Sequence, residues 1–409
     1  MISSRRRVVV TGIGAVTAAG IGVDPFWRSA VEGRSHLAAA NGSIAARFGA
    51  MSVGTAPLPP EAQGERAGAA ALLATKEALR SARLHDREPL PPETGIVLGT
   101  CLGGMAPTLD WIDAMRARGI SSEGRGGSRG PDAPAFPSFP VSGGLAGPTR
   151  RVAHAFELLG PVVTLSTACS SGAAAIAEAC GWIRDGGANL MLAGGAESLT
   201  AFVLSGFAIL QALTHGRMRP FDRRRDGLAL GEGAAIVVLE ERRAAQERGA
   251  PILAEVLGAG VSSDAHHMTS PAPGGEGIGR AIDAALADAR LTAAHVSFVN
   301  AHGTGTVLND RAEASALVRL FRRGADVPVN AVKPVTGHTL GAAGALEAIL
   351  CVRAIGQGLL PPTIGCDEPE PDFALDVVRG AARRQPVATA LSLSCGFGGH
   401  NVALLLGEA

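Results

Sequence analysis

Short runs of β-branched and aliphatic residues alternate with longer alanine-rich segments along the whole chain, and this alternation limits the fold more than any other feature. The short runs lack the polar alternation of half-buried strands, so both of their faces are expected to be buried. The predicted strands are residues 8–11, 95–98, 162–165, 189–193, 234–239, 252–257, 296–300, 387–393 and 402–406. The predicted helices are residues 67–83, 169–184, 277–289, 310–321 and 340–354. The pattern indicates an α/β protein with parallel-type sheets covered by helices on both faces.

Bulk composition is that of a large globular protein. The 409 residues are 46% hydrophobic and 18% charged, and the formal net charge of zero gives no argument for a nucleic-acid or membrane partner. No uninterrupted run of about 18 apolar residues predicts a membrane span, and the apolar run after Arg7 is too short for a signal peptide. The six cysteines include no Cys-x-x-Cys pair, which argues against a disulfide framework or a structural zinc and favours the cytoplasm.

Two segments indicate how the chain is organised. Residues 121–147 are rich in Gly, Pro and Ser and predict a long loop. The charged helical segment 240–248 is followed by Gly249-Ala250-Pro251, which indicates a boundary between two halves of the chain. We therefore expect two halves, residues 1–250 and 251–409, that share a loose rhythm of valine-rich strand, Gly-Ala-Gly and helix.

The segment around Cys169 carries the strongest chemical signal. Thr167-Ala168-Cys169-Ser170-Ser171-Gly172 separates an apolar run from a run of small residues, which predicts a buried strand, a tight turn and a closely packed helix. A cysteine at the start of a helix is stabilised as thiolate by the helix dipole, so Cys169 is a candidate nucleophile.

Two histidines and a lysine downstream strengthen that hypothesis. His302 follows a predicted strand and precedes Gly303-Thr304-Gly305-Thr306, and His338 lies in a turn that leads into a helix of small residues. Lys333 is one of only two lysines in a chain that otherwise uses arginine. This indicates that a compact ammonium, rather than a guanidinium, is required at this position. Each histidine alone is more often structural, but a thiol and two imidazoles suit carbon–carbon bond formation on thioesters. The thiolate takes an acyl group, and the imidazoles donate to a developing enolate.

Together these segments resemble the β-ketoacyl-acyl carrier protein synthases, the elongating condensing enzymes with a Cys-His-His site. The likeness runs almost end to end. It is carried by residues 8–17, Met218-Arg219-Pro220-Phe221-Asp222, and residues 231–234, 264–269, 300–302 and 396–401. The resemblance implies a thiolase-like fold, in which two related α/β halves stack as αβαβα layers, and a dimer.

The resemblance also implies roles for individual residues. Cys169 would be the acylated nucleophile. His302 and His338 would bind the malonyl thioester carbonyl and support decarboxylation, and Lys333 would order the site electrostatically, paired with Glu347.

Further implied roles concern the oxyanion hole and the substrate arm. The backbone N–H groups of Cys169 and Phe397 would form the oxyanion hole, and Phe397 would gate the acyl pocket on a loop loosened by glycines. Those glycines are Gly396, Gly398 and Gly399. Thr304 and Thr306 would bind the phosphopantetheine arm, and a second mobile, substrate-binding loop would contain Asp264, His267 and Thr269.

The implied reaction is a decarboxylative Claisen condensation of an acyl-enzyme with malonyl-acyl carrier protein, in fatty-acid or polyketide chain elongation. No metal and no cofactor of the enzyme's own would be needed, because the carrier protein supplies the phosphopantetheine. The expected partners are the acyl carrier protein and a second copy of the chain.

Alternative interpretations stay open at this point. A thiolase would use a second cysteine such as Cys395, and a Cys-His hydrolase would release free acid from thioesters. A structural or chain-length-determining subunit of a heterodimeric synthase would lack the nucleophile that this chain keeps. Pro334, in place of a small polar residue, and the unusual segment 134–151 leave substrate length and the choice between homodimer and heterodimer undecided.

Overall fold

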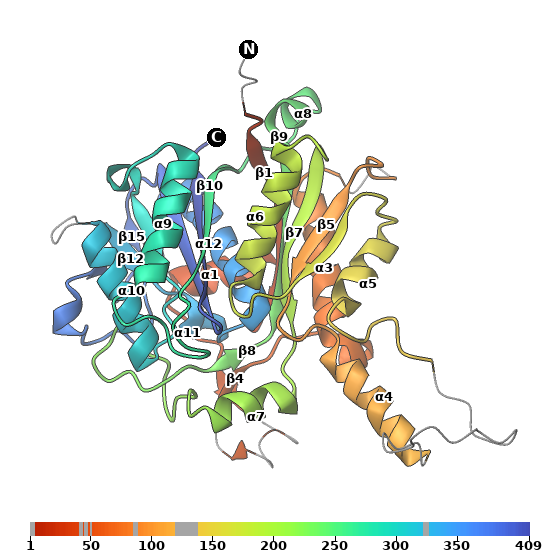
Figure 1. Ribbon diagram of the computed structural model, residues 1–409, viewed down its shortest axis with the longest axis horizontal. Helices are drawn as coiled ribbons and strands as arrows, with labels where there is room; N and C mark the ends of the chain where they lie inside the picture. Colours follow the sequence, from red (N-terminus) through yellow and green to blue (C-terminus); the bar gives the residue numbers. More distant parts are fainter. Residues whose placement is uncertain are drawn as a thin grey trace, which may run out of the picture.

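A computed structural model describes residues 5–40, 44, 48, 49, 51–84, 89–118, 138–321 and 327–409. Most of the segment 121–147 predicted as a long loop lies outside the described residues. In the described part, twelve strands form one large mixed sheet that runs through the molecule, with helices on its faces (Figure 1). Both ends of the chain lie at the same end of the molecule (Figure 1).

Strands from the first part of the chain form one side of this sheet. The order is β1 (Val8–Thr17), β9 (Gly233–Glu241), β7 (Leu190–Glu197), β5 (Gly95–Gly99) and β6 (Val162–Leu165). β9 pairs antiparallel with both β1 and β7, whereas β7, β5 and β6 pair in parallel. The parallel-type sheet expected from the sequence is therefore only partly correct, because β1 and β9 are as apolar as the parallel strands but run antiparallel.

Strands from the second part of the chain repeat the same pattern of pairings. The order is β10 (Ala254–Ser263), β17 (His400–Gly407), β16 (Thr389–Gly396), β11 (Phe298–Asn300) and β12 (Pro328–Asn330), followed by β14 (Asp376–Val377). β17 pairs antiparallel with β10 and β16, and β16, β11 and β12 pair in parallel. β1 and β10 join the two sets antiparallel. The boundary between residues 250 and 251 stays a prediction.

The helices complete an αβαβα arrangement. α6 (Ser171–Arg184) and α12 (Ala343–Gln357) pack against each other between the two sets of strands. α3 (Arg66–Ser81) and α5 (Gly147–Ala155) cover the outer face of the first set, and α9 (Glu276–Ala289) with α10 (Val307–Leu320) covers the second. The other α-helices for which the described residues give bounds are α1 (Val23–Val31), α4 (Met105–Ala117), α7 (Ala201–Ile209), α8 (Arg242–Glu247) and α11 (Lys333–Thr336).

The other strands and the 3-10 helices of the described residues are short. The strands are β2 (Gly20–Ile21), β3 (Ala38–Ala39), β4 (Ser52–Gly54), β8 (Leu230–Gly231), β13 (Leu359–Leu360) and β15 (Arg383–Arg384). The 3-10 helices are η1 (Pro60–Glu65), η2 (Ala293–His295), η3 (Leu340–Ala342) and η4 (Pro371–Phe373).

Small residues let the two central helices approach closely. A Cβ added at Gly172 of α6 would lie 2.7 Å from the carbonyl oxygen of Gly341 and 3.0 Å from the backbone nitrogen of Ala345. The same close contact holds the loop before α12 against the turn before α6. The helical stretch Leu340–Gln357 is long and apolar enough to cross a membrane, but 83% of it is buried inside the protein, as in a core helix.

Candidate active site

Cys169 lies in a tight turn between β6 and α6, as the sequence predicts, although α6 begins two residues later, at Ser171. Ala168 has φ +52°, an unusual value for a residue with a side chain, and this sharp turn presents Cys169 at the helix N-terminus. The Ser171 hydroxyl accepts a hydrogen bond from the Thr167 N–H at 2.9 Å and donates to the Ala168 carbonyl oxygen at 2.5 Å. The turn is therefore fixed by its own side chains.

The surroundings of Cys169 favour its thiolate. A hydrogen bond from the Cys101 thiol is the main cause that lowers the pKa of Cys169 well below its ordinary value, and His338 and Lys333 lower it further. The pKa of Cys101 is raised well above its ordinary value by the same hydrogen bond, by burial and by the charge of Glu197. Cys169 is therefore the ionised member of the pair and Cys101 the protonated one.

The His302 ring is held as a neutral donor. It follows β11, and its backbone N–H donates to Glu313 Oε1 at 2.6 Å. Lys333 Nζ lies 3.1 Å from His302 Nδ1, and because an ammonium can only donate, Nδ1 accepts and the ring proton is on Nε2. Burial and the Lys333 charge lower the pKa of His302 well below its ordinary value, so the ring stays uncharged.

His338 has the same tautomer for a different reason. The backbone N–H of Leu340 donates to His338 Nδ1 at 3.2 Å, which leaves the proton on Nε2. The backbone of His338 is held between Ala229 and Gly231, at β8. The two imidazole centroids are 5.3 Å apart and the rings are nearly perpendicular, at 82°. Two Nε2–H donors thus lie beside one thiolate.

Lys333 and Glu347 form a buried ion pair. Lys333 Nζ lies 2.5 Å from Glu347 Oε1, and the two side chains are 2% and 1% exposed. Lys333 also donates to the carbonyl oxygen of His302. One ammonium therefore fixes both the backbone and the ring of His302, while Glu347 balances its charge.

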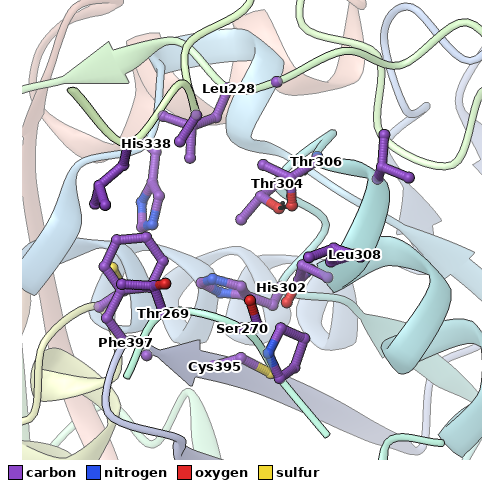
Figure 2. A pocket seen from close by; sticks show the side chains of 18 of the residues that line it. Leu228, Thr269, Ser270, His302, Thr304, Thr306, Leu308, His338, Cys395 and Phe397 are labelled. Atoms are coloured by element: carbon purple, nitrogen blue, oxygen red, sulfur yellow. Dashed lines mark hydrogen bonds between the residues drawn. The ribbon is translucent and has the colours of Figure 1, made fainter. Parts of the chain in front are cut away.

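A cavity of about 290 Å³ opens onto these groups. Of the residues predicted to form the site, it is lined by Cys169, Asp264, Thr269, His302, Thr304, Thr306, His338, Gly396, Phe397 and Gly399. Figure 2 shows both imidazoles facing this space, with the Thr304 and Thr306 hydroxyls to one side; their oxygens are 2.9 Å apart. His267 is not among the lining residues: its exposed ring accepts the Thr269 N–H of its own loop at 3.1 Å.

Phe397 closes one side of the cavity by stacking on Phe207 of α7, with centroids 5.5 Å apart and planes at 23°. Gly398 and Gly399 follow with φ of +84° and +77°, values that favour glycine. The Gly398 N–H donates to the Met268 carbonyl oxygen at 2.7 Å, so the two loops expected to be mobile are hydrogen-bonded to each other. Gly396 lies close to the Cys169 turn: an added Cβ would lie 2.8 Å from the Thr167 carbonyl oxygen and 3.3 Å from the Cys169 nitrogen.

Comparison with known proteins identifies the family of the chain. Models described as "Beta-ketoacyl synthase, N-terminal domain" and "Beta-ketoacyl synthase, C-terminal domain" match residues 59–245 and 253–367. The chain belongs to the β-ketoacyl synthase family. It is accordingly an acyltransferase of fatty-acid or polyketide chain elongation, and a soluble enzyme.

Relatives of this β-ketoacyl synthase come from both kinds of pathway. The tetracenomycin polyketide synthase ketoacyl synthase alpha subunit of Streptomyces glaucescens is 36% identical, over 98% of this chain and 97% of its own. The 3-oxoacyl-[acyl-carrier-protein] synthase 2 of Synechocystis is 35% identical over the same shares. The structure of the ishigamide ketosynthase/chain length factor matches with a TM-score of 0.88 and 33% identity, covering 99% of this chain and 100% of that one. This solved ketosynthase shares its thiolase-like fold.

Several residues at the site of this synthase carry no signal in the sequence. Cys101 and Phe207 each lie in an unremarkable segment and reach the site only through the fold. Glu313 lies in α10, 11 residues after His302, and accepts the His302 backbone N–H. Cys395 lines the cavity, but burial, with the charge of Glu313, raises the pKa of its thiol well above the ordinary value. It therefore does not act as the second reactive cysteine of a thiolase.

Proposed function

We propose that this synthase accepts an acyl group on Cys169 from an acyl carrier protein and condenses it with malonyl-carrier protein. The observation that carries the assignment is the meeting of a thiolate and two Nε2–H donors at one cavity. In the first step the Cys169 thiolate attacks the acyl thioester, and the carrier thiolate leaves.

The second step uses the imidazoles. Malonyl-carrier protein enters, the bond to its terminal carboxylate breaks, and CO₂ leaves its electron pair on the α-carbon. The resulting enolate oxygen accepts hydrogen bonds from His302 Nε2–H and His338 Nε2–H, which are in place before the charge develops. The carbanion attacks the acyl group on Cys169, and the thiolate is expelled as a β-ketoacyl product, longer by two carbons, forms.

Other predicted groups receive their roles within this proposal. The backbone N–H groups of Cys169 and Phe397 hold the tetrahedral oxyanion, and the close approach of Gly396, which precedes Phe397, to the Cys169 turn supports this role. The paired hydroxyls of Thr304 and Thr306 offer hydrogen bonds to the amides of the phosphopantetheine arm, with Asp264 and Thr269 on the facing loop. His267 positions that loop rather than contacting the substrate.

The proposal extends to cofactors, location and assembly. The described residues contain no group of three or more candidate metal ligands, and the reaction as written needs no metal or cofactor beyond the carrier's arm. Six free cysteines suit the cytoplasm.

The proposed partners follow from two solved relatives. One is described as a type II polyketide-synthase acyl-carrier protein in complex with its ketosynthase, and another as a ketosynthase/chain length factor. Because the chain keeps its own complete Cys-His-His set, we assign it the role of a catalytic subunit. Its proposed partner is a second copy of the chain, and a chain-length-factor-like subunit is the alternative.

The test separates the two steps. We expect His302→Ala and His338→Ala to lose CO₂ release from malonyl-carrier protein by about 10²–10³-fold while self-acylation falls much less, since the imidazoles act on the enolate. Equal loss of both steps would contradict separate roles. Product formation by the purified chain alone supports the homodimer, whereas activity only with an added chain-length-factor-like subunit would support the heterodimer.

A further inference from the structure

A second thiol lies directly against the proposed nucleophile. Cys101 follows β5, whose last residues pack on the start of α6: a Cβ at Gly99 would lie 2.2 Å from the carbonyl carbon of Ser171. Ser171 Oγ lies 3.4 Å from the Thr100 carbonyl oxygen, which fixes the loop of Cys101 beside the turn of Cys169. The two thiols share a hydrogen bond and belong to the same apolar cluster. Condensation with malonyl-carrier protein gives Cys101 no step to perform.

The two sulfur atoms differ in access and in charge. Cys169 lines the cavity of about 290 Å³, so a small hydroperoxide can reach it from solvent. Cys101 does not line that cavity and stays protonated, and its backbone N–H donates to Glu197 Oε2 at 2.6 Å. Oxidation therefore begins at Cys169, because the thiolate is the form that attacks peroxide.

The geometry points to Cys101 as a resolving thiol that captures the oxidised nucleophile in a reversible Cys101–Cys169 disulfide. The oxidant is hydrogen peroxide or another small hydroperoxide. The Cys169 thiolate attacks one peroxide oxygen, the O–O bond breaks, and hydroxide leaves, so that Cys169 becomes a sulfenic acid. The Cys101 sulfur then attacks the sulfenic sulfur, and its proton departs with the hydroxyl as water. A dithiol reductant restores both thiols by exchange.

Oxidation itself prepares Cys101 for this second step. The main cause that keeps Cys101 protonated is its hydrogen bond to the Cys169 thiolate, and a neutral sulfenic acid no longer provides it. Once Cys169 is oxidised, the Cys101 thiol can therefore ionise and react. The consequence is protective: a disulfide returns to two thiols, whereas sulfinic acid on Cys169 would end activity permanently.

The experiment treats the purified full-length chain with increasing hydrogen peroxide, blocks remaining thiols with N-ethylmaleimide, and maps non-reduced peptides by mass spectrometry. We expect a peptide linking Cys101 to Cys169, loss of two hydrogens from the intact mass, and recovery of acylation after dithiothreitol. In Cys101→Ser we expect no link, one or two added oxygens on Cys169, and little recovery. Cys395→Ser, which removes the other thiol of the cavity, is the mapping control and should still form the link.

Two results would overturn the inference. One is wild-type protein in which Cys169 accumulates added oxygens as fast as in Cys101→Ser; the other is a link from Cys169 to Cys395 instead of Cys101. Because the inference rests on Cys169 being the proposed nucleophile, alkylation of Cys169 by iodoacetamide is measured separately. Rapid alkylation without a peroxide-induced link contradicts the resolving thiol alone, whereas slow alkylation contradicts the nucleophile. The wild-type peptide map decides the question even if Cys101→Ser folds poorly.

Discussion

The two imidazoles owe their chemistry to the ring nitrogen that faces away from the cavity. Lys333 donates to His302 Nδ1 and the Leu340 N–H donates to His338 Nδ1, so both rings carry a donor N–H at Nε2 beside the cavity. One partner is a charged side chain and the other is a backbone group. A substitution of Lys333 should therefore remove the hydrogen-bond donor to His302 Nδ1. The donor to His338 Nδ1 is a backbone N–H, which a side-chain substitution does not remove.

Replacement of Lys333 by Ala should lower the free energy of unfolding by about 3–5 kcal/mol, because it leaves Glu347 as an unpaired buried charge. The double variant Lys333→Met/Glu347→Gln should recover most of that stability, since no buried charge remains. Decarboxylation should stay about 10²–10³-fold below wild type in both, because His302 Nδ1 has lost its donor. Chemical denaturation and CO₂ release measure the two effects. Full recovery of decarboxylation in the double variant would show that Lys333 serves stability only.

Phe397→Ala should slow self-acylation by up to about tenfold and change which chain lengths are accepted, because its stacking on Phe207 is worth about 0.5–1.5 kcal/mol. Phe207→Ala should give the same change, and the double variant should be little worse than either single one. Phe202→Ala is the control, since Phe202 is on the same helix but 56% exposed and outside the cavity. Strictly additive effects would contradict a gate formed by the pair.

The site residues that lie in a recognisable local pattern could be predicted from the sequence. Cys169, His302, His338 and Lys333 each occupy a strand end or a glycine-rich turn, and the structure brings all four together. Cys101 carries no such local pattern, because its contact with Cys169 depends on parallel pairing of β5 with β6, which one sequence does not reveal.

At the scale of elements, the contact between α6 and α12 determines the distance between Cys169, the proposed nucleophile, and the imidazoles. Cys169 precedes α6 and His338 precedes α12, and the helices meet where Gly172 leaves room for Gly341 and Ala345. A bulkier residue at this contact would move both loops at once.

Gly172→Ala should destabilise the protein by about 1–3 kcal/mol and reduce acylation, because the new methyl group overlaps Gly341 and Ala345. Gly181→Ala in the same helix is the matched control: nothing lies within 4 Å of the added Cβ, so a gain of about 0.5–1 kcal/mol with unchanged activity is expected. Thermal unfolding and acylation rates compare the two. Equal behaviour of both variants would show that close packing at Gly172 is unimportant.

Glu197, at the end of β7, accepts hydrogen bonds from the backbone N–H groups of Cys101 and Gly341 and so links two loops. Burial raises the pKa of Glu197 from about 4.5 to about 7. Because the folded protein binds this proton more tightly than the unfolded chain, its contribution to stability is complete below pH 4.5 and is lost as pH rises to about 7. The slope is about 1.4 kcal/mol per pH unit. Glu197→Gln should flatten that part of a stability profile from denaturant unfolding. An unchanged slope would contradict the assignment to Glu197.

Element prediction succeeded where apolar periodicity was long and failed where it was short or mixed. The predicted helices correspond to α3, α6, α9, α10 and α12, each with a buried face. α4 was not predicted, since none of its residues is buried and it extends from the body (Figure 1). Strand direction was predicted only in part, because β1 and β9 are buried on both faces like parallel strands.

At the scale of the whole molecule, the two sets of strands repeat one order of pairings, and the active site lies where their central helices meet. Each set contributes something the other lacks: the first provides Cys169, and the second provides His302, His338 and Lys333. Alternating strands and helices in the sequence predicted an α/β fold, but the thiolase-like layering came from resemblance to a family. Strand order depends on long-range pairing, which local pattern does not encode.

The most direct test of the account is the intact mass of the protein after incubation with acyl-carrier proteins of graded chain length, followed by malonyl-carrier protein. The account predicts an acyl adduct on Cys169 that disappears as a β-keto product longer by two carbons forms on the carrier, and no adduct in Cys169→Ala. Absence of an adduct with every donor, or an adduct that persists in Cys169→Ala, would contradict it.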